Sequence, residues 1–170
     1  HSRIHLARSW LEMGEVEKAR DHALKCHEET VSQPDKALHA RARAVLGRFY
    51  AKTGDSELAL HHYSEALEQM GNDGDPIALV ETTILLGEVL EDSERMEEAL
   101  DIYREGLLIA EGNDLRMQIG ELLARLGGAA PDMTRRMEYL QRSLTVFWEL
   151  GAEGRMREIQ NMVHQAIIGR

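Results

Sequence analysis

Small and aromatic residues recur along this chain with a period of 40 residues. Ala19, Ala59 and Ala99 are each 40 positions apart, and the same spacing separates Tyr63 from Tyr103. A fixed period of this size is typical of solenoids, in which similar supersecondary units stack on one another. The pattern therefore predicts a repeat protein.

Within each period, apolar residues return every three or four positions, which is the spacing of one face of a helix. Turns rich in Gly and Asp separate these segments. Gly54 suits a left-handed residue after a helix, and Asp55 or Ser56 suits the N-cap of the next one. Gly127-Gly128 is interpreted as a flexible break that shortens the helix before it. The sequence thus predicts an all-α fold, with helices over residues 4–13, 16–30, 41–52, 57–70, 77–91, 94–111, 117–126, 133–150 and 155–168.

The helices group into a single array over residues 1–170. Its repeats are predicted at residues 1–34, 35–75, 76–114 and 115–151, with an extra helix at 152–170. The apolar face of that last helix needs a cover, whereas the ends of natural arrays usually carry polar caps. We therefore expect a fragment of a longer array, with a final solvating helix as the alternative. The face comprises Met156, Ile159, Val163, Ala166 and Ile167.

The second period has a specific arrangement of small and aromatic residues. It comprises Leu46-Gly47, Tyr50, Gly54, Ala59, Tyr63 and Ala66. This arrangement resembles the tetratricopeptide repeat (TPR) at every position. The third period matches at Leu86-Gly87, Ala99 and Tyr103, and departs at Leu90, Glu94 and Gly106.

The resemblance implies a right-handed superhelical solenoid of antiparallel helix pairs. Because the period exceeds the family's usual length, the chain is most similar to long-period TPRs of LGN/Pins-like cell-polarity adaptors and MalT-like bacterial regulators. HEAT or armadillo repeats also fit a period near 40 residues. They lack the Leu-Gly, Gly and Ala signature, so they rank second.

TPR arrays bind peptides on a concave face lined by the first helix of each pair. The family register implies a ligand groove that is basic at its first end and acidic in the middle. This split would orient a partner's acidic segment toward the first end and a basic segment toward the middle. The alternative is that these are ordinary solvated charges. The implied groove residues are Arg8, Arg41, Arg48, Lys52, Glu81, Glu88, Glu91, Asp92 and Arg125.

Composition narrows the possible partners and location. The formal net charge is −10, which argues against nonspecific binding to nucleic acid or to anionic membranes. Cys26 is the one cysteine, so no internal disulfide can form and a reducing compartment is expected. No apolar run reaches the roughly 18 residues of a membrane span. We therefore expect a cytoplasmic protein.

Candidate chemistry is sparse. His1 and His5 have a spacing that can bind zinc on a helix, but no Cys or carboxylate cluster accompanies them. Adjacent His61 and His62 face different directions on a helix. Gly127-Gly128 is not a phosphate loop, because no Gly-Lys-Ser/Thr follows. We expect no metal site, no cofactor and no catalysis by this chain.

The sequence therefore predicts a protein–protein interaction module with an adaptor or scaffold role, whose partner is a protein or peptide. The alternative is a sensor or regulatory TPR segment of a larger signalling protein or enzyme. A third possibility is self-association through the terminal helices. Fold class alone does not decide among these.

Overall fold

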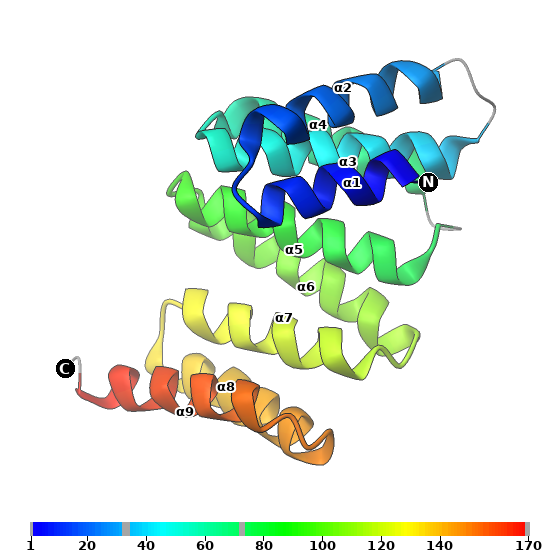
Figure 1. Ribbon diagram of the computed structural model, residues 1–170. Helices are drawn as coiled ribbons and strands as arrows, with labels where there is room; N and C mark the ends of the chain where they lie inside the picture. The colour runs from blue at the N-terminus through cyan, green and yellow to red at the C-terminus, as the bar shows by residue number, and fades with distance from the viewer. Residues whose placement is uncertain (1, 32–34, 72–73, 169–170) are drawn as a thin grey trace. The chain divides into compact units, whose positions relative to one another are not determined.

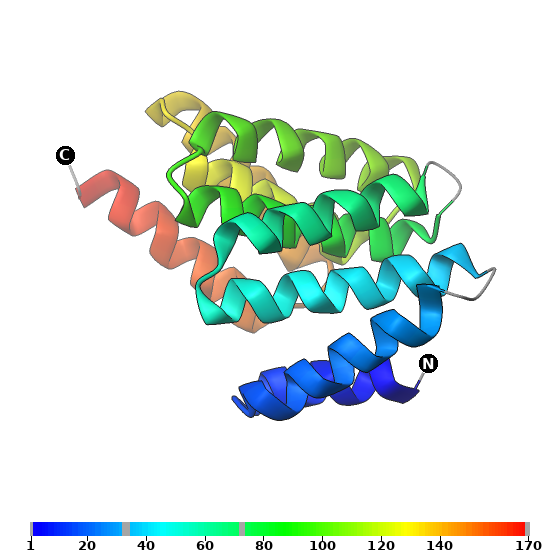
Figure 2. The same cartoon turned by 90° about the horizontal axis from the view of Figure 1, so that it is seen from above.

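The computed structural model describes residues 2–31, 35–71 and 74–168, and the regular structure within these residues is entirely α-helical (Figure 1). Within each of the two compact units of the chain, successive helices run antiparallel (Figure 2), so the prediction of an all-α fold of antiparallel helix pairs is confirmed. The helices of the described residues are α1 (Ser2–Glu12), α2 (Val16–Val31), α3 (Lys36–Thr53), α4 (Ser56–Met70), α5 (Pro76–Asp92), α6 (Met96–Gly112), α7 (Arg116–Ala129), α8 (Met133–Glu149) and α9 (Glu153–Ile168).

The chain forms two compact units. Unit 1 comprises residues 1–93 and contains α1 to α5, and unit 2 comprises residues 94–170 and contains α6 to α9. The boundary lies between the two helices of the predicted third repeat, 76–114. The repeat boundaries within a single array stay a prediction.

Unit 1 is built in two layers. Each helix packs against the next one in the chain, and α3 also contacts α1 and α5. The helices α1, α3 and α5 therefore lie next to one another, while α2 and α4 pack on them. The core between α1, α2 and α3 is mostly aliphatic and alanine, with Leu11, Ala23 and Leu46 almost fully buried.

Unit 2 packs α6 on α7, α7 on α8 and α8 on α9. The expectation that the apolar face of the last helix lacks a cover is wrong at its centre. Ile159 is 1% exposed, and Met156 and Val163 pack with it against Leu140 and Phe147. The face is covered within unit 2 because α9 packs against α8 and Met162 reaches the backbone of α7 at Gly128. Ile167, near the end of α9, is 56% exposed.

Aspartate caps fix the start of several helices. The Asp35 side chain accepts a hydrogen bond from the Leu38 amide at 3.0 Å, so α3 begins at Lys36 rather than at the predicted residue 41. Asp55 caps α4 in the same way, by accepting from the Leu58 amide, as its sequence position predicts. Such a side chain satisfies one of the helix's otherwise unpaired amide groups.

Left-handed turn residues follow the helices at the repeat spacing. Gly54 has φ of 83°, as predicted, and Glu94, which stands 40 positions later, has φ of 60°. Asp114 and Gly151 also have positive φ. A residue other than glycine is strained there, so the turn geometry persists even where the glycine signature is lost.

The predicted break at Gly127-Gly128 is wrong, since α7 continues through both glycines to Ala129. A β-carbon at Gly127 would lie 2.7 Å from the side chain of Leu140. The glycine is therefore needed for close packing of α8 and not for a flexible loop. The helix ends because Pro131 disfavours helical geometry in the residue before it, and Ala130 is accordingly extended.

The same close approach of helix backbones occurs inside the pair of α3 and α4 and inside the pair of α7 and α8. A β-carbon at Gly47 would lie 2.7 Å from the ring of Tyr63, and at Gly120 it would lie 2.7 Å from the ring of Phe147. Tyr63 is 1% exposed and Phe147 is fully buried. The rings have no free space to move into, so each glycine sets the distance between its two helices.

We expect Gly47→Ala and Gly120→Ala to destabilise their units by about 1–3 kcal/mol each, because the added methyl group overpacks a buried ring. The measurement is urea unfolding followed by circular dichroism. The control is Gly154→Ala in α9, where an added β-carbon meets no atom within 4 Å. Stability equal to the wild type in the first two variants would contradict the packing.

Candidate functional site

A pocket of about 250 Å³ lies among α1, α3 and α5 of unit 1. We call it the unit 1 pocket. Its apolar wall comes mainly from α3 and α5, and its charged side chains come from all three helices and from the residue that caps α5. Its lining includes Ile4, Ala44, Val45, Ala78 and Leu85 on the apolar side and Arg8, Arg41, Arg48, Asp75 and Glu81 on the charged side.

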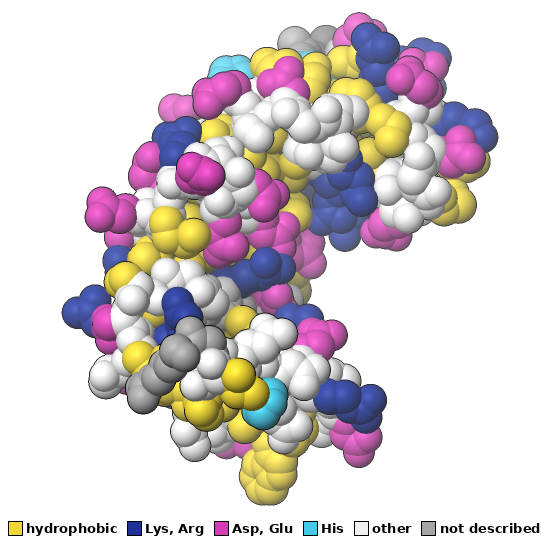
Figure 3. All heavy atoms as spheres, turned by 90° about the vertical axis from the view of Figure 1, so that its left-hand side faces the viewer, with side chains coloured by type: hydrophobic (Ala, Val, Ile, Leu, Met, Phe, Trp, Pro, Cys, Tyr) yellow, Lys and Arg dark blue, Asp and Glu magenta, His cyan; other side chains and the backbone are white. Residues whose placement is uncertain are grey.

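Three arginines and two carboxylates line this pocket. The predicted groove residues Arg8, Arg41, Arg48 and Glu81 are therefore brought together, although they come from three helices. Figure 3 shows a group of Lys and Arg side chains beside Asp and Glu side chains in the upper part of the view, where unit 1 lies. Four of the nine predicted groove residues thus line one pocket, where the three arginines lie close to an acidic residue of the same set.

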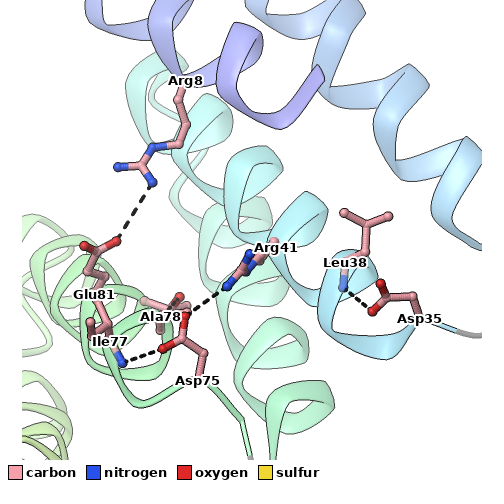
Figure 4. A network of polar contacts seen from close by, with 9 residues as sticks. Arg8, Asp35, Leu38, Arg41, Asp75, Ile77, Ala78 and Glu81 are labelled. Atoms are coloured by element: carbon pink, nitrogen blue, oxygen red, sulfur yellow. Dashed lines mark hydrogen bonds and ion pairs between the residues drawn. The ribbon is translucent and has the colours of Figure 1, made fainter. Parts of the chain in front are cut away.

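Arg41 forms an ion pair with a carboxylate that also caps the start of α5. Its Nη2 lies 2.9 Å from Oδ2 of Asp75. The other carboxylate oxygen of Asp75 accepts a hydrogen bond from the Ile77 amide at 3.2 Å, at the start of α5. Arg41 is thus tied to the cap of a neighbouring helix (Figure 4).

Arg8 makes a looser contact. Its Nη1 lies 4.0 Å from Oε2 of Glu81, so α1 and α5 face each other through an ion pair that is too long for a hydrogen bond (Figure 4). Both side chains are substantially exposed, at 41% and 46%. Water screens such a pair, which contributes little to stability.

Arg48 is half-buried and lies near the hydroxyl group of Tyr63. Burial raises the pKa of Tyr63, while the guanidinium of Arg48 acts in the opposite direction and the carboxylate of Glu88 adds to the rise. Arg48 and Glu88 therefore approach the same buried phenol. This contact links the pocket to the packed interior of the α3–α4 pair.

The remaining predicted residues lie outside the unit 1 pocket. Lys52 is on the last turn of α3, and Glu91 and Asp92 end α5. Arg125 belongs to unit 2, where its Nε lies 3.3 Å from Oε1 of Glu121, a carboxylate that also pairs with Arg155 of α9. The role of all nine residues in ligand binding stays a prediction.

A cluster of aromatic rings lies where α2, α3 and α4 meet, and the sequence analysis missed it. His27 stacks on His39 with ring centres 5.1 Å apart, and His62 stacks on Tyr50 at 5.3 Å with nearly parallel planes. His27 and His62 meet edge to face at 6.3 Å. A usable signal existed in the sequence, since His27 lies four residues before the end of α2 at Val31 and His39 lies three residues after the start of α3 at Lys36.

Positive charge beside the histidine cluster opposes its protonation. Burial lowers the pKa of His62 from 6.5 to about 4, and His61, Arg43 and His27 act in the same direction. Burial and the Arg43 guanidinium also lower the pKa of His27 and of His39. The rings are therefore neutral packing groups at neutral pH.

We expect unit 1 to lose stability as the pH falls from 6.5 toward 4. In this window the unfolded chain binds a proton at His62 that the folded chain does not, so the free energy of unfolding decreases with decreasing pH. Because partial exposure of the ring screens the effect, we expect a loss of about 1–2 kcal/mol from this group. The measurement is urea unfolding across the pH range.

His62→Gln removes this titration and flattens the pH dependence relative to the wild type. The matched control for the substitution itself is His164→Gln, at an exposed position of α9 in unit 2. An identical slope in the wild type and in His62→Gln would contradict the role of the cluster.

Two further features can be checked in the part of the chain that the structure describes, namely metal-ligating groups and membrane-spanning helices. There, no group of three or more His, Cys, Asp or Glu side chains is arranged to hold a metal ion. His1, one half of the predicted zinc spacing, lies outside the described residues, and His5 is exposed. Among the described helices, none combines the length and apolar character needed to cross a bilayer.

Comparison with known proteins agrees with this architecture. Residues 40–69 match the family model of the tetratricopeptide repeat. This segment contains the Leu46-Gly47, Tyr50, Gly54, Ala59, Tyr63 and Ala66 signature. None of the curated proteins matches the chain.

Solved structures share the fold at low sequence identity. A STAND signal-transduction ATPase with a tetratricopeptide repeat sensor from Pyrococcus horikoshii matches 96% of this chain with a TM-score of 0.84 and 17% identity. Aspartyl phosphate phosphatase F from Bacillus subtilis matches 98% with a TM-score of 0.87 and 12% identity. The Rap conjugation gene regulator of plasmid pLS20, in complex with the Phr* peptide, matches 97% with a TM-score of 0.68 and 15% identity.

The chain spans 26% of the STAND protein and 47% of each of the other two. Identities this low establish the fold alone. Residues 40–69 thus match a tetratricopeptide repeat, and the chain shares the fold of solved structures that contain such repeats.

Proposed function

We propose that unit 1 binds a peptide segment of a partner protein across α1, α3 and α5, and that the chain acts as an adaptor or scaffold module without catalysis. The observation that supports this most strongly is the unit 1 pocket, which combines an apolar wall with three arginines and two carboxylates. Binding sites of this kind use apolar surface for affinity and a few charged groups for orientation.

The distribution of charged residues in unit 1 indicates how the proposed peptide would be oriented. An acidic part of the peptide lies near Arg8 and Arg48, and a basic part lies toward Glu88, Glu91 and Asp92, at the other end of α5. Complementary charge of this kind sets the register and speeds association. Self-association is a less direct alternative, because the centre of the α9 face is already buried within unit 2.

The solved structure of the Rap conjugation gene regulator contains a bound Phr* peptide, so a protein of this fold binds a peptide. A second candidate function is a sensor or regulatory segment of a larger signalling protein. It is favoured by the likeness to a STAND ATPase whose tetratricopeptide repeats form its sensor and of which this chain spans 26%.

The test is capture of partners from a lysate by the immobilised protein and by an Arg8→Glu/Arg48→Glu variant, read by mass spectrometry. We expect at least one protein to bind the wild type and to be lost from the variant, because the reversed charges repel its acidic segment. Arg41 is left intact, since its substitution would also disturb the Asp75 cap of α5.

The matched control is Arg20→Glu/Lys25→Glu, which reverses two exposed charges on α2 and should keep the partner. Circular dichroism must show that all three proteins are folded. Equal capture by the wild type and the Arg8→Glu/Arg48→Glu variant would exclude binding through the pocket and would favour the regulatory alternative.

A further inference from the structure

The three arginines of the unit 1 pocket are held in different ways. Arg41 donates to Asp75 at 2.9 Å, and Asp75 is itself fixed by the Ile77 amide. Replacing Asp75 by a ligand carboxylate would cost the cap of α5 as well as the ion pair. Arg41 therefore has a structural partner that a peptide does not easily displace.

Arg8, by contrast, makes a loose ion pair with its carboxylate partner. Its contact with Glu81 spans 4.0 Å between two half-exposed side chains and forms no hydrogen bond (Figure 4). A guanidinium group has five N–H donors and binds a carboxylate best through two parallel hydrogen bonds. The present pair does not achieve this geometry, so a better-placed carboxylate can replace Glu81.

Glu81 occupies the place that an incoming carboxylate would take. It comes from α5, across the pocket from Arg8 on α1, and both residues line the pocket. Its negative charge also repels any anion that enters. A residue so placed competes with the ligand for the same arginine.

We infer that the unit 1 pocket recognises an Asp or Glu side chain of the partner peptide by exchange, in which Arg8 leaves Glu81 and pairs with the ligand carboxylate. Glu81 is then a specificity-determining residue that acts as an internal competitor, whereas Arg41 is a structural residue. This inference rests on the proposed function, since it concerns the ligand of the same pocket.

The test is selection of a random dodecapeptide library, displayed on phage, against the wild-type protein and against Arg8→Gln, Arg41→Gln and Glu81→Gln. We expect wild-type binders to share an acidic residue at one position. This preference is lost with Arg8→Gln and retained with Arg41→Gln. Thermal unfolding must show that each variant is folded.

The affinity of one selected acidic peptide is then measured by fluorescence anisotropy at about 0.15 M salt, where charges beyond about 8 Å are largely screened. We expect Glu81→Gln to bind it more tightly, by about threefold, because the substitution removes the exposed pair that competes for Arg8 and the repulsion between Glu81 and the ligand carboxylate. The same peptide with Gln at the acidic position shows no such gain. The charge-matched control is Glu68→Gln, at an exposed position of α4 that does not line the pocket, and it leaves the affinity unchanged.

The outcomes separate the two proposals. Binders without an acidic preference, or equal affinity of the wild type and Glu81→Gln, overturn the exchange at Arg8 and leave peptide binding standing. An equal gain in Glu68→Gln also overturns it, because the effect would then be general electrostatics. A failure of every protein to select any peptide overturns the proposed function and this inference together.

Discussion

The structure depends on how closely two antiparallel helices can approach within a pair. Because Gly47 and Gly120 have no β-carbon, the backbone of each glycine can lie against a buried ring of the partner helix. These rings belong to Tyr63 and Phe147 respectively. Protein interiors are packed densely, so this spacing fixes the relative position of the two helices and of everything they carry. This packing requires little of the sequence. One helix needs a small residue, and the partner helix needs a large residue directly opposite it.

That constraint gives α3 a defined position between two different environments. Toward α2 and α4 it presents His39, Arg43 and Tyr50 to the histidine cluster. Toward α1 and α5 it presents Arg41 and Arg48 to the unit 1 pocket. A fixed α3 positions the backbone that carries Arg41 and Arg48, and such preorganisation would reduce the ordering cost of the proposed peptide binding.

The elements that follow from local rules could be predicted from the sequence. The helix pairs follow from apolar spacing, and the Gly54 turn and the Asp55 cap follow from the conformational preferences of single residues. Gly127-Gly128 was misread because glycine serves both flexible loops and close helix contacts, and only the opposing Leu140 distinguishes them. The contact between Arg8 and Glu81 joins residues 73 positions apart, so it depends on how successive pairs stack. The family register placed both residues on one face but could not show that they form an ion pair.

The central claim is that a peptide lies across α1, α3 and α5 of unit 1. The most direct measurement is a two-dimensional ¹⁵N–¹H NMR titration of the whole protein with an acidic peptide selected from the library, with the backbone amides assigned. The result that we predict is that shifts concentrate at α1, α3 and α5 around Arg8, Ala44 and Glu81, while α2 and α4 change little. Shifts concentrated on α2 and α4, or confined to unit 2, would contradict a binding site in the unit 1 pocket.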